Sequence, residues 1–172
     1  MALRIFLRTA ENVGAKEKEA FIRLVQSGEA VDGTFVRSGI ERRGAKMVFA
    51  TNGGELAGVA ALKVPASSYR NGLGETAKAG YALPEQLFPF ELGYVAVAPK
   101  YEGKGLGTRL VQEVVSSSAG KGLFATTSSP AMLEHILPKS GFTRAGKPWI
   151  GTKSSESAES YTLHLLIRKA IA

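Results

Sequence analysis

The segment from residue 102 to residue 108 carries the residues best suited to chemistry. It reads Glu102-Gly103-Lys104-Gly105-Leu106-Gly107-Thr108. Glycine allows main-chain N–H groups to approach a ligand closely, and the first N–H groups of a helix have no partner within that helix. A helix expected over 107–118 begins in this segment. We therefore predict an anion site suited to a pyrophosphate group.

The spacing of these glycines excludes two common nucleotide-binding loops. A Walker A loop needs Gly-x-x-x-x-Gly-Lys-Ser/Thr, which the sequence does not contain. A dinucleotide fingerprint needs Gly-x-Gly-x-x-Gly and an acidic residue about 20 positions later. Here the three glycines alternate with other residues, and residues 125–129 read Ala-Thr-Thr-Ser-Ser. The loop is therefore expected to bind a different phosphorylated ligand.

Hydrophobic periodicity and turn residues predict the elements that position this loop. Strands are expected at 3–8, 46–50, 56–63, 91–97, 122–127, 142–145 and 161–167, and helices at 16–27, 107–118 and 130–137. Further short helices are expected within 29–44 and near 76–83, and Asn52-Gly53-Gly54 predicts a hairpin turn. Residues 64–90 show no clear periodicity. The element order predicts one α/β domain over 1–172 with a mixed sheet.

The loop resembles the acyl-CoA loop of the GNAT superfamily of N-acetyltransferases, whose pattern is Gln/Arg-x-x-Gly-x-Gly/Ala. Glu102 replaces the family's Gln or Arg, so we assign phosphate binding to the main chain of 103–108. Residues 97–101 are similar to the family's Val-x-Pro-x-Tyr approach. Residues 137–142 resemble its late Tyr-x-Lys-x-Gly-Phe element. The close match covers 91–142, about a third of the chain.

The resemblance implies a GNAT-like, mostly antiparallel central sheet of six or seven strands flanked by helices. The strands at 91–97 and 122–127 would splay apart and admit the pantetheine arm of acetyl-CoA, the implied cosubstrate. Main-chain groups of Val95 and Val97 would pair with its amides, and one N–H would stabilise the developing oxyanion. The implied acetyl-CoA contacts are Val95, Ala96, Val97, Gly103, Lys104, Gly105, Leu106, Gly107 and Thr108.

Glu91 is the candidate general base. An alkyl amine has a pKa of about 10, so a base must remove its proton before it attacks a thioester. Strict alternation along the strand would place Glu91 on the same face as Gly93, Val95 and Val97. The resemblance also implies a glutamate at this position. The structural alternative is a strand-end Glu that caps a loop or pairs with Lys or Arg.

The general acid is left open, because Leu137 occupies the position of the family's tyrosine. Tyr94, Tyr101, Tyr161 and His135 are the other candidates. A CoA thiolate is also a fair leaving group without an acid. The alternative to an active enzyme is a non-catalytic acyl-CoA sensor or interaction protein.

The segment 64–90 is interpreted as a substrate-facing lid, with a surface insertion as the alternative. Tyr69, Arg70 and Phe90 are the candidate acceptor contacts, and Arg70 would suit a carboxylate or phosphate on the acceptor. The acceptor is an amine on a small molecule or a protein. Polyamines, amino acids, antibiotics, protein lysines and aminoacyl-tRNA all remain open.

Composition narrows the chemistry further. The sequence has no cysteine, which excludes disulfides, thiolate metal ligands and an acyl-cysteine intermediate and favours direct attack in a ternary complex. His135 and His164, the only two histidines, lack metal-ligand spacing, so no metal is expected. Trp149 is expected in the core rather than in an acceptor pocket.

Charge and hydropathy bear on partners and location. The chain has 172 residues, 22 Lys+Arg and 15 Asp+Glu, and its net charge of +7 favours an anionic partner. A nucleic-acid modifier is the remaining alternative, but no nucleic-acid-binding motif accompanies the charge. No apolar stretch approaches the ~20 residues of a membrane span. We expect a cytoplasmic protein with no membrane partner, and leave a homodimer open.

Overall fold

The seven strands of the protein form one mixed sheet. The structure, a computed structural model, describes residues 2–28, 33–152 and 160–171. The strand order is β1-β2-β3-β4-β5-β7-β6. The β4–β5 pair is parallel, whereas β1–β2, β2–β3, β5–β7 and β6–β7 are antiparallel. The predicted fold class, a mixed and mostly antiparallel sheet with helices, is therefore confirmed.

The helices and strands follow the predicted order, except that α3 lies earlier in segment 64–90 than predicted and η1 was not predicted. The strands are β1 (Leu3–Thr9), β2 (Lys46–Asn52), β3 (Glu55–Lys63), β4 (Phe90–Val97), β5 (Leu123–Thr127), β6 (Thr143–Thr152) and β7 (Ser160–Arg168). The helices are α1 (Ala15–Gly28), α2 (Gly33–Glu41), α3 (Ser67–Leu73), η1 (Pro99–Tyr101), α4 (Leu106–Ser117), η2 (Met132–Ile136) and α5 (Leu137–Lys139).

The chain divides into two compact units. Unit 1 comprises Met1–Val64 and Leu92–Ala119, and unit 2 comprises Pro65–Glu91 and Gly120–Ala172. The assignment of residues 1–172 to a single domain stays a prediction. Each unit has its own buried core.

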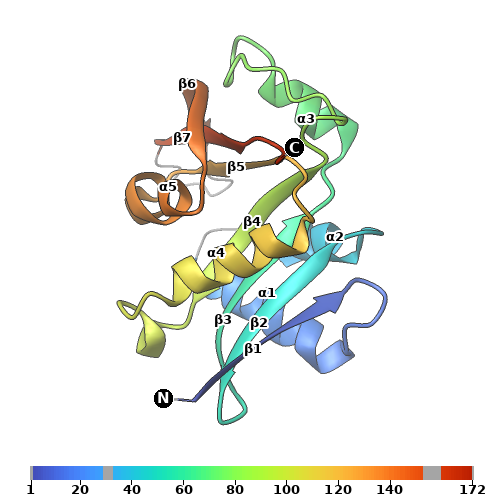
Figure 1. The fold of residues 1–172 in the computed structure, drawn as a ribbon, viewed down its shortest axis with the longest axis vertical. Helices are drawn as coiled ribbons and strands as arrows, with labels where there is room; N and C mark the ends of the chain where they lie inside the picture. The colour runs from blue at the N-terminus through green and yellow to red at the C-terminus, as the bar shows by residue number, and fades with distance from the viewer. Residues whose placement is uncertain (1, 29–32, 153–159, 172) are drawn as a thin grey trace. The chain divides into compact units, whose positions relative to one another are not determined.

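Unit 1 packs helices on both faces of β2 and β3 (Figure 1). On one face, Phe21 of α1 and Ile40 of α2 are buried with Phe49 of β2. On the other face lies α4. A Cβ atom on Gly58 would lie 2.8 Å from a methyl group of Leu110 and 3.2 Å from the Ala96 carbonyl oxygen, so the glycine allows α4 to approach β3 closely. Close packing against β3 therefore fixes the helix that follows the glycine-rich loop.

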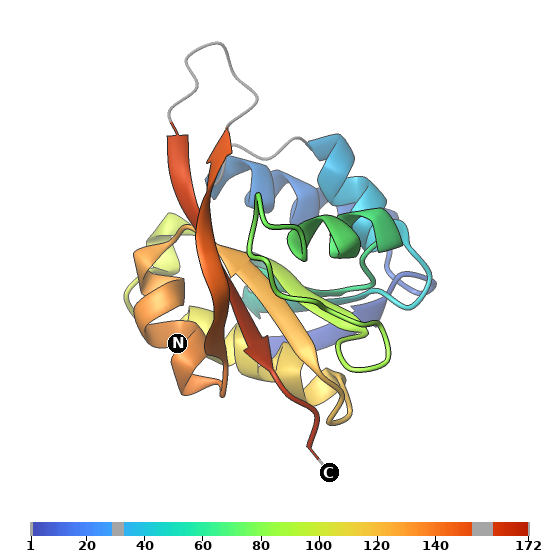
Figure 2. The same cartoon turned by 90° about the horizontal axis from the view of Figure 1, so that it is seen from above.

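Unit 2 contains the β5–β7–β6 part of the sheet, in which β6 and β7 run side by side (Figure 2). β6 continues to Thr152, beyond residue 145, where the sequence analysis placed the end of the strand. A register shift allows this, since an irregular segment accommodates a proline that a regular ladder excludes. Gly146 has a φ of +63°, and the Lys147 N–H donates to the Ala79 carbonyl at 3.0 Å. Trp149 is buried in the core, as predicted.

The segment 64–90 differs from expectation. Its helix, α3, lies at Ser67–Leu73 rather than near 76–83, and only two of its residues, Arg70 and Leu73, are buried. Two buried positions are too few to produce a visible apolar period. Leu73, Leu83 and Phe88 belong to the core of unit 2. The expected lid is therefore anchored to its own unit by buried side chains.

Candidate active site

Glu91, the predicted base, lies beside a predicted acceptor contact. Its side chain is 3% exposed, and its main chain pairs with Phe124 in β5. Tyr69, on α3, is 38% exposed, and its hydroxyl donates a hydrogen bond to Glu91 Oε1 at 3.2 Å. Both residues belong to unit 2. The structure thus brings together a buried carboxylate and the hydroxyl of a partly exposed tyrosine.

The ladder between β4 and β5 is short. It consists of Phe90 with Leu123 and Glu91 with Phe124, although β4 continues to Val97. Phe90, the third predicted acceptor contact, is half-buried in this ladder. The splay expected from the family resemblance requires such an early end of the ladder. Glu91 is therefore the last residue of β4 that pairs with β5.

An irregularity in β4 overturns the strict alternation assumed from the sequence. Tyr94 has a φ of +53°, which is rare for a residue other than glycine. A Cβ atom on Gly93 would contact the side chain of Lys63, and the Lys63 ammonium also lies 4.3 Å from the centre of the Tyr94 ring. Two consecutive residues thus adjoin one side chain, as in a β-bulge. Counting alternate residues across this point does not place Glu91 on the face of Val95 and Val97.

The glycine-rich loop has the backbone that the sequence predicted. Gly103 and Gly105 have φ values of +75° and +78°, and no atom lies within 4 Å of a Cβ atom built on either. Gly105 is the N-cap of α4, without a hydrogen bond from a capping side chain. The first turn of α4 therefore retains the N–H groups that a capping side chain would have engaged. This open, uncapped start of a helix fits a diphosphate group.

The other predicted acetyl-CoA contacts differ in how far their residues are exposed. Leu106 is buried between α4 and β3, so it can offer a ligand only its main chain. Lys104 is exposed, whereas Gly107 and Thr108 are half-buried. Val95, Ala96 and Val97 are half-buried in β4, and the strand is joined to β3 just beyond its end by the hydrogen bond from Ala98 N–H to Ala57 O, at 2.8 Å.

Arg70 binds the protein itself. Its side chain is 6% exposed and donates hydrogen bonds to the carbonyl oxygens of Leu83, Phe88 and Pro89. Burial lowers the pKa of the Arg70 guanidinium, while the carboxylates of Glu85 and Glu91 oppose that shift. Arg70 therefore ties α3 to the chain that enters β4, a role that the sequence did not reveal.

The candidate general acids are dispersed. Leu137 is fully buried and has no proton to give. Tyr101 is buried in unit 1, where its hydroxyl accepts a hydrogen bond from Asn52 at 3.2 Å. The Tyr94 hydroxyl donates to the Phe35 carbonyl at 3.2 Å. His135 is exposed on η2, and Tyr161 is half-buried on β7.

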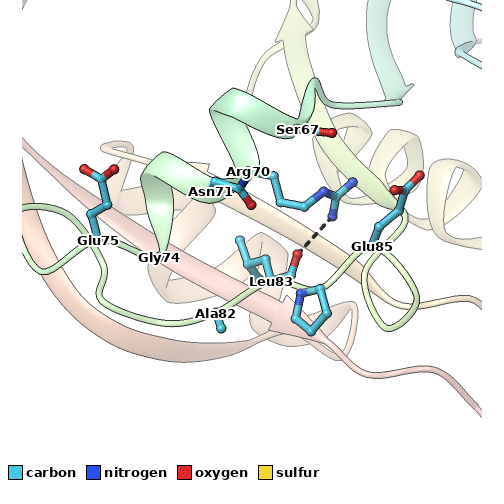
Figure 3. Close-up of a pocket in the computed structure, with 9 residues that line it drawn as sticks. Ser67, Arg70, Asn71, Gly74, Glu75, Ala82, Leu83 and Glu85 are labelled. Carbon is cyan, nitrogen blue, oxygen red and sulfur yellow. Dashed lines mark hydrogen bonds between the residues drawn. The ribbon is translucent and has the colours of Figure 1, made fainter.

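A pocket opens beside α3 in unit 2 (Figure 3). Its volume is about 440 Å³, within the usual range for a small-molecule site. Figure 3 shows Glu75 and Glu85 at opposite ends of the lining, with the Arg70 guanidinium on the side of Glu85. The lining residues are Ser67, Arg70, Asn71, Gly74, Glu75, Ala82, Leu83, Pro84 and Glu85. Sequence analysis identified only Arg70 among them.

The sequence pattern described as the Acetyltransferase (GNAT) family matches residues 16–133. This is more than half of the chain, and the chain therefore belongs to that family. The predicted family and enzyme class, an acyltransferase, are confirmed. Comparison with curated protein sequences finds no match.

Solved structures share the fold. An acyl-CoA N-acyltransferase from Pseudomonas aeruginosa superposes with a TM-score of 0.69 at 12% identity, covering 97% of this chain and 99% of that one. A Bacillus subtilis acetyltransferase in complex with CoA gives 0.63 at 19% identity, with coverages of 99% and 100%. A GNAT family acetyltransferase from Elizabethkingia anophelis with acetyl-CoA bound gives 0.61 at 17%, with 97% of each chain covered.

Among the residues that the structure describes, no helix is both long enough and apolar enough to cross a membrane. Among the same residues, no group of three or more His, Cys, Asp or Glu side chains is arranged to hold a metal ion.

Proposed function

We propose that the protein transfers an acetyl group from acetyl-CoA to an acceptor amine by direct attack, with Glu91 as the general base. The observation that carries this proposal is the buried Glu91 carboxylate at the end of the β4–β5 ladder, held by the Tyr69 hydroxyl. Family membership supports the reaction class. The acetyl-CoA and CoA complexes of similar folds support the donor.

The glycine-rich loop would hold the donor. Acetyl-CoA supplies an activated acyl group when it is bound. Main-chain N–H groups of 103–108 bind its diphosphate, because Gly103 and Gly105 have an open backbone and α4 lacks a capping side chain. The main chain of Val95 and Val97 pairs with the pantetheine amides and supplies an N–H to the reacting carbonyl.

The acceptor would bind in unit 2. An ammonium acceptor loses its proton to the Glu91 carboxylate before or during attack. The pocket beside α3 receives the rest of the acceptor, because Arg70 lines this pocket and Tyr69, the preceding residue, donates a hydrogen bond to Glu91. Leu137 cannot protonate the thiolate, so we assign its departure to the stability of the thiolate itself.

The test is release of CoA in the presence of a panel of amines, for the wild type and for Glu91→Gln. The variant keeps the size of the side chain but not its charge, and we expect a fall in turnover of about 10²–10⁴-fold, typical of a lost general base. Glu113→Gln is the control, since Glu113 is exposed on α4 in unit 1. Equal activity of Glu91→Gln and wild type would refute the base.

An acyl-CoA sensor is the second candidate, favoured by the buried Leu137 where the family has a tyrosine. A thermal-shift titration separates the two functions. Acetyl-CoA at 100 times its Kd should raise the stability by about 2.7 kcal/mol in either case. Stabilisation without CoA release for any amine supports the sensor, and no stabilisation at millimolar acetyl-CoA rejects both.

A further inference from the structure

Arg70 and Tyr69, both on α3, form what we call a brace: their hydrogen bonds hold the chain around Glu91. Arg70 fixes α3 to the carbonyl groups of Leu83, Phe88 and Pro89, immediately before β4 begins. Tyr69 is the neighbour of Arg70 on the same short helix, and its hydroxyl reaches Glu91, 22 residues later in the sequence. Arg70 therefore fixes α3 in place, and Tyr69, the residue before it, holds the Glu91 carboxylate from the same helix.

We infer that Tyr69 is a positioning residue for the general base: its hydroxyl holds the Glu91 carboxylate in one orientation. The inference rests on the proposed function of Glu91. A hydroxyl that donates to one carboxylate oxygen restricts rotation of the carboxylate, so both oxygens keep the position that proton transfer needs.

Burial makes this hydrogen bond important. Glu91 is 3% exposed, so water replaces lost hydrogen bonds to its carboxylate only poorly. Tyr69 is 38% exposed, so its ring spans from the solvent to the buried oxygen. Of the ionisable side chains of unit 2, Arg70 also acts on Glu91, through an electrostatic attraction rather than a direct hydrogen bond. The Tyr69 hydroxyl can therefore be removed while the hydrogen bonds of Arg70 continue to hold α3 in place.

The same geometry distinguishes Tyr69 from the tyrosines considered as proton donors. The hydroxyl groups of Tyr94 and Tyr101 are bonded within unit 1, to Phe35 and Asn52 respectively. Tyr69 is bonded to the base itself. Its role is therefore assigned to the deprotonation of the acceptor and not to the leaving thiolate.

The test is the steady-state kinetics of Tyr69→Phe, which removes the hydroxyl and keeps the ring. We expect kcat to fall about tenfold, because a carboxylate without this contact is misplaced for proton transfer. The KM for acetyl-CoA should not change. Tyr81→Phe is the matched control, because Tyr81 is a half-buried tyrosine of unit 2 that packs against its core. A kcat of Tyr69→Phe equal to those of both wild type and Tyr81→Phe overturns the inference.

Two further measurements separate this inference from the proposed function. Glu91→Gln with full activity would reject the base but would leave the hydrogen bond to be tested. NMR of the ¹³C-labelled Glu91 carboxylate, without substrates, then decides: a carboxylate chemical shift that changes in Tyr69→Phe but not in Tyr81→Phe supports the inference, and an unchanged chemical shift rejects it. Should Tyr69→Phe fail to fold, Tyr69→His is measured in the same way, with the same two outcomes.

Discussion

Arg70 donates a hydrogen bond from Nη1 to the carbonyl oxygen of Phe88, two residues before β4 begins. The Leu83 and Pro89 carbonyls accept further hydrogen bonds from the same guanidinium, and its carbon atom lies 5.7 Å from the centre of the Phe124 ring. A single buried cation thus organises three carbonyl groups and an aromatic side chain within unit 2.

Loss of this guanidinium should destabilise the protein. Arg70→Met keeps an apolar stem but leaves buried carbonyl groups without donors, so we expect a loss of about 2–4 kcal/mol in the free energy of unfolding. Urea denaturation measures it. Arg144→Met is the control, because the Arg144–Glu134 pair, at 2.6 Å, is solvent-exposed and should contribute at most about 1 kcal/mol. Equal losses in the two variants would contradict the role of Arg70.

Shortening the base should be nearly as harmful as neutralising it. Glu91→Asp retains the charge but withdraws the carboxylate from both the Tyr69 hydroxyl and the acceptor. A misplacement of about 1 Å can cost ~10²-fold in rate, so we expect a fall of that order in kcat. Steady-state CoA release measures the effect. Activity within twofold of wild type would mean that the carboxylate position is not critical.

The glycines of the loop offer a matched comparison. Gly103→Ala introduces a side chain at a φ of +75°, which should cost about 1–2 kcal/mol of stability and weaken acetyl-CoA binding. Gly53→Ala in the β2–β3 turn introduces a similar strain at a φ of +57°, also in open space. The second variant should lose stability but keep its acetyl-CoA affinity, as measured by calorimetry. Equal affinity losses would attribute the Gly103 effect to general destabilisation.

Filling the pocket beside α3 should impair acceptor binding alone. Ala82 is an exposed lining residue, so Ala82→Phe should occupy part of the pocket without disturbing the core. We expect the KM of the acceptor to rise about tenfold or more, because the Phe side chain takes up space that the acceptor needs. The KM of acetyl-CoA should not change. Ala77→Phe, on the exposed turn outside the lining, is the control, and equal effects of both variants would place the acceptor elsewhere.

Local patterns predicted most of the fold and the loop, because both depend on neighbouring residues. The seven strands follow apolar runs, and the open backbone at Gly103 and Gly105 follows from glycine itself. The missed features depend on distant contacts. The Tyr69–Glu91 hydrogen bond spans 22 residues, and Arg70 serves carbonyl groups up to 19 residues away. The local hydrophobic period of a sequence does not predict contacts between residues this far apart.

The irregularities of the strands were missed for a related reason. The sequence analysis ended a strand at residue 145, yet β6 continues across a register shift, where the Lys147 N–H donates a hydrogen bond to the Ala79 carbonyl. At Tyr94, local preference favours φ below zero. A side-chain hydrogen bond to the Phe35 carbonyl and an edge contact with the Phe21 ring, at 6.4 Å, support the observed +53°. Tertiary contacts overrode local preference at both points.

The left-handed backbone conformation of Tyr94 determines which side of the sheet the later side chains of β4 face. Removing one residue there would exchange inward and outward side chains from Val95 to Val97, since neighbours in a strand point to opposite sides. Substitutions can therefore accumulate along this strand, whereas single-residue insertions and deletions should be rejected. A chimaera built with a relative should exchange β4 as a whole, together with the Phe21 and Phe35 contacts that hold its kink.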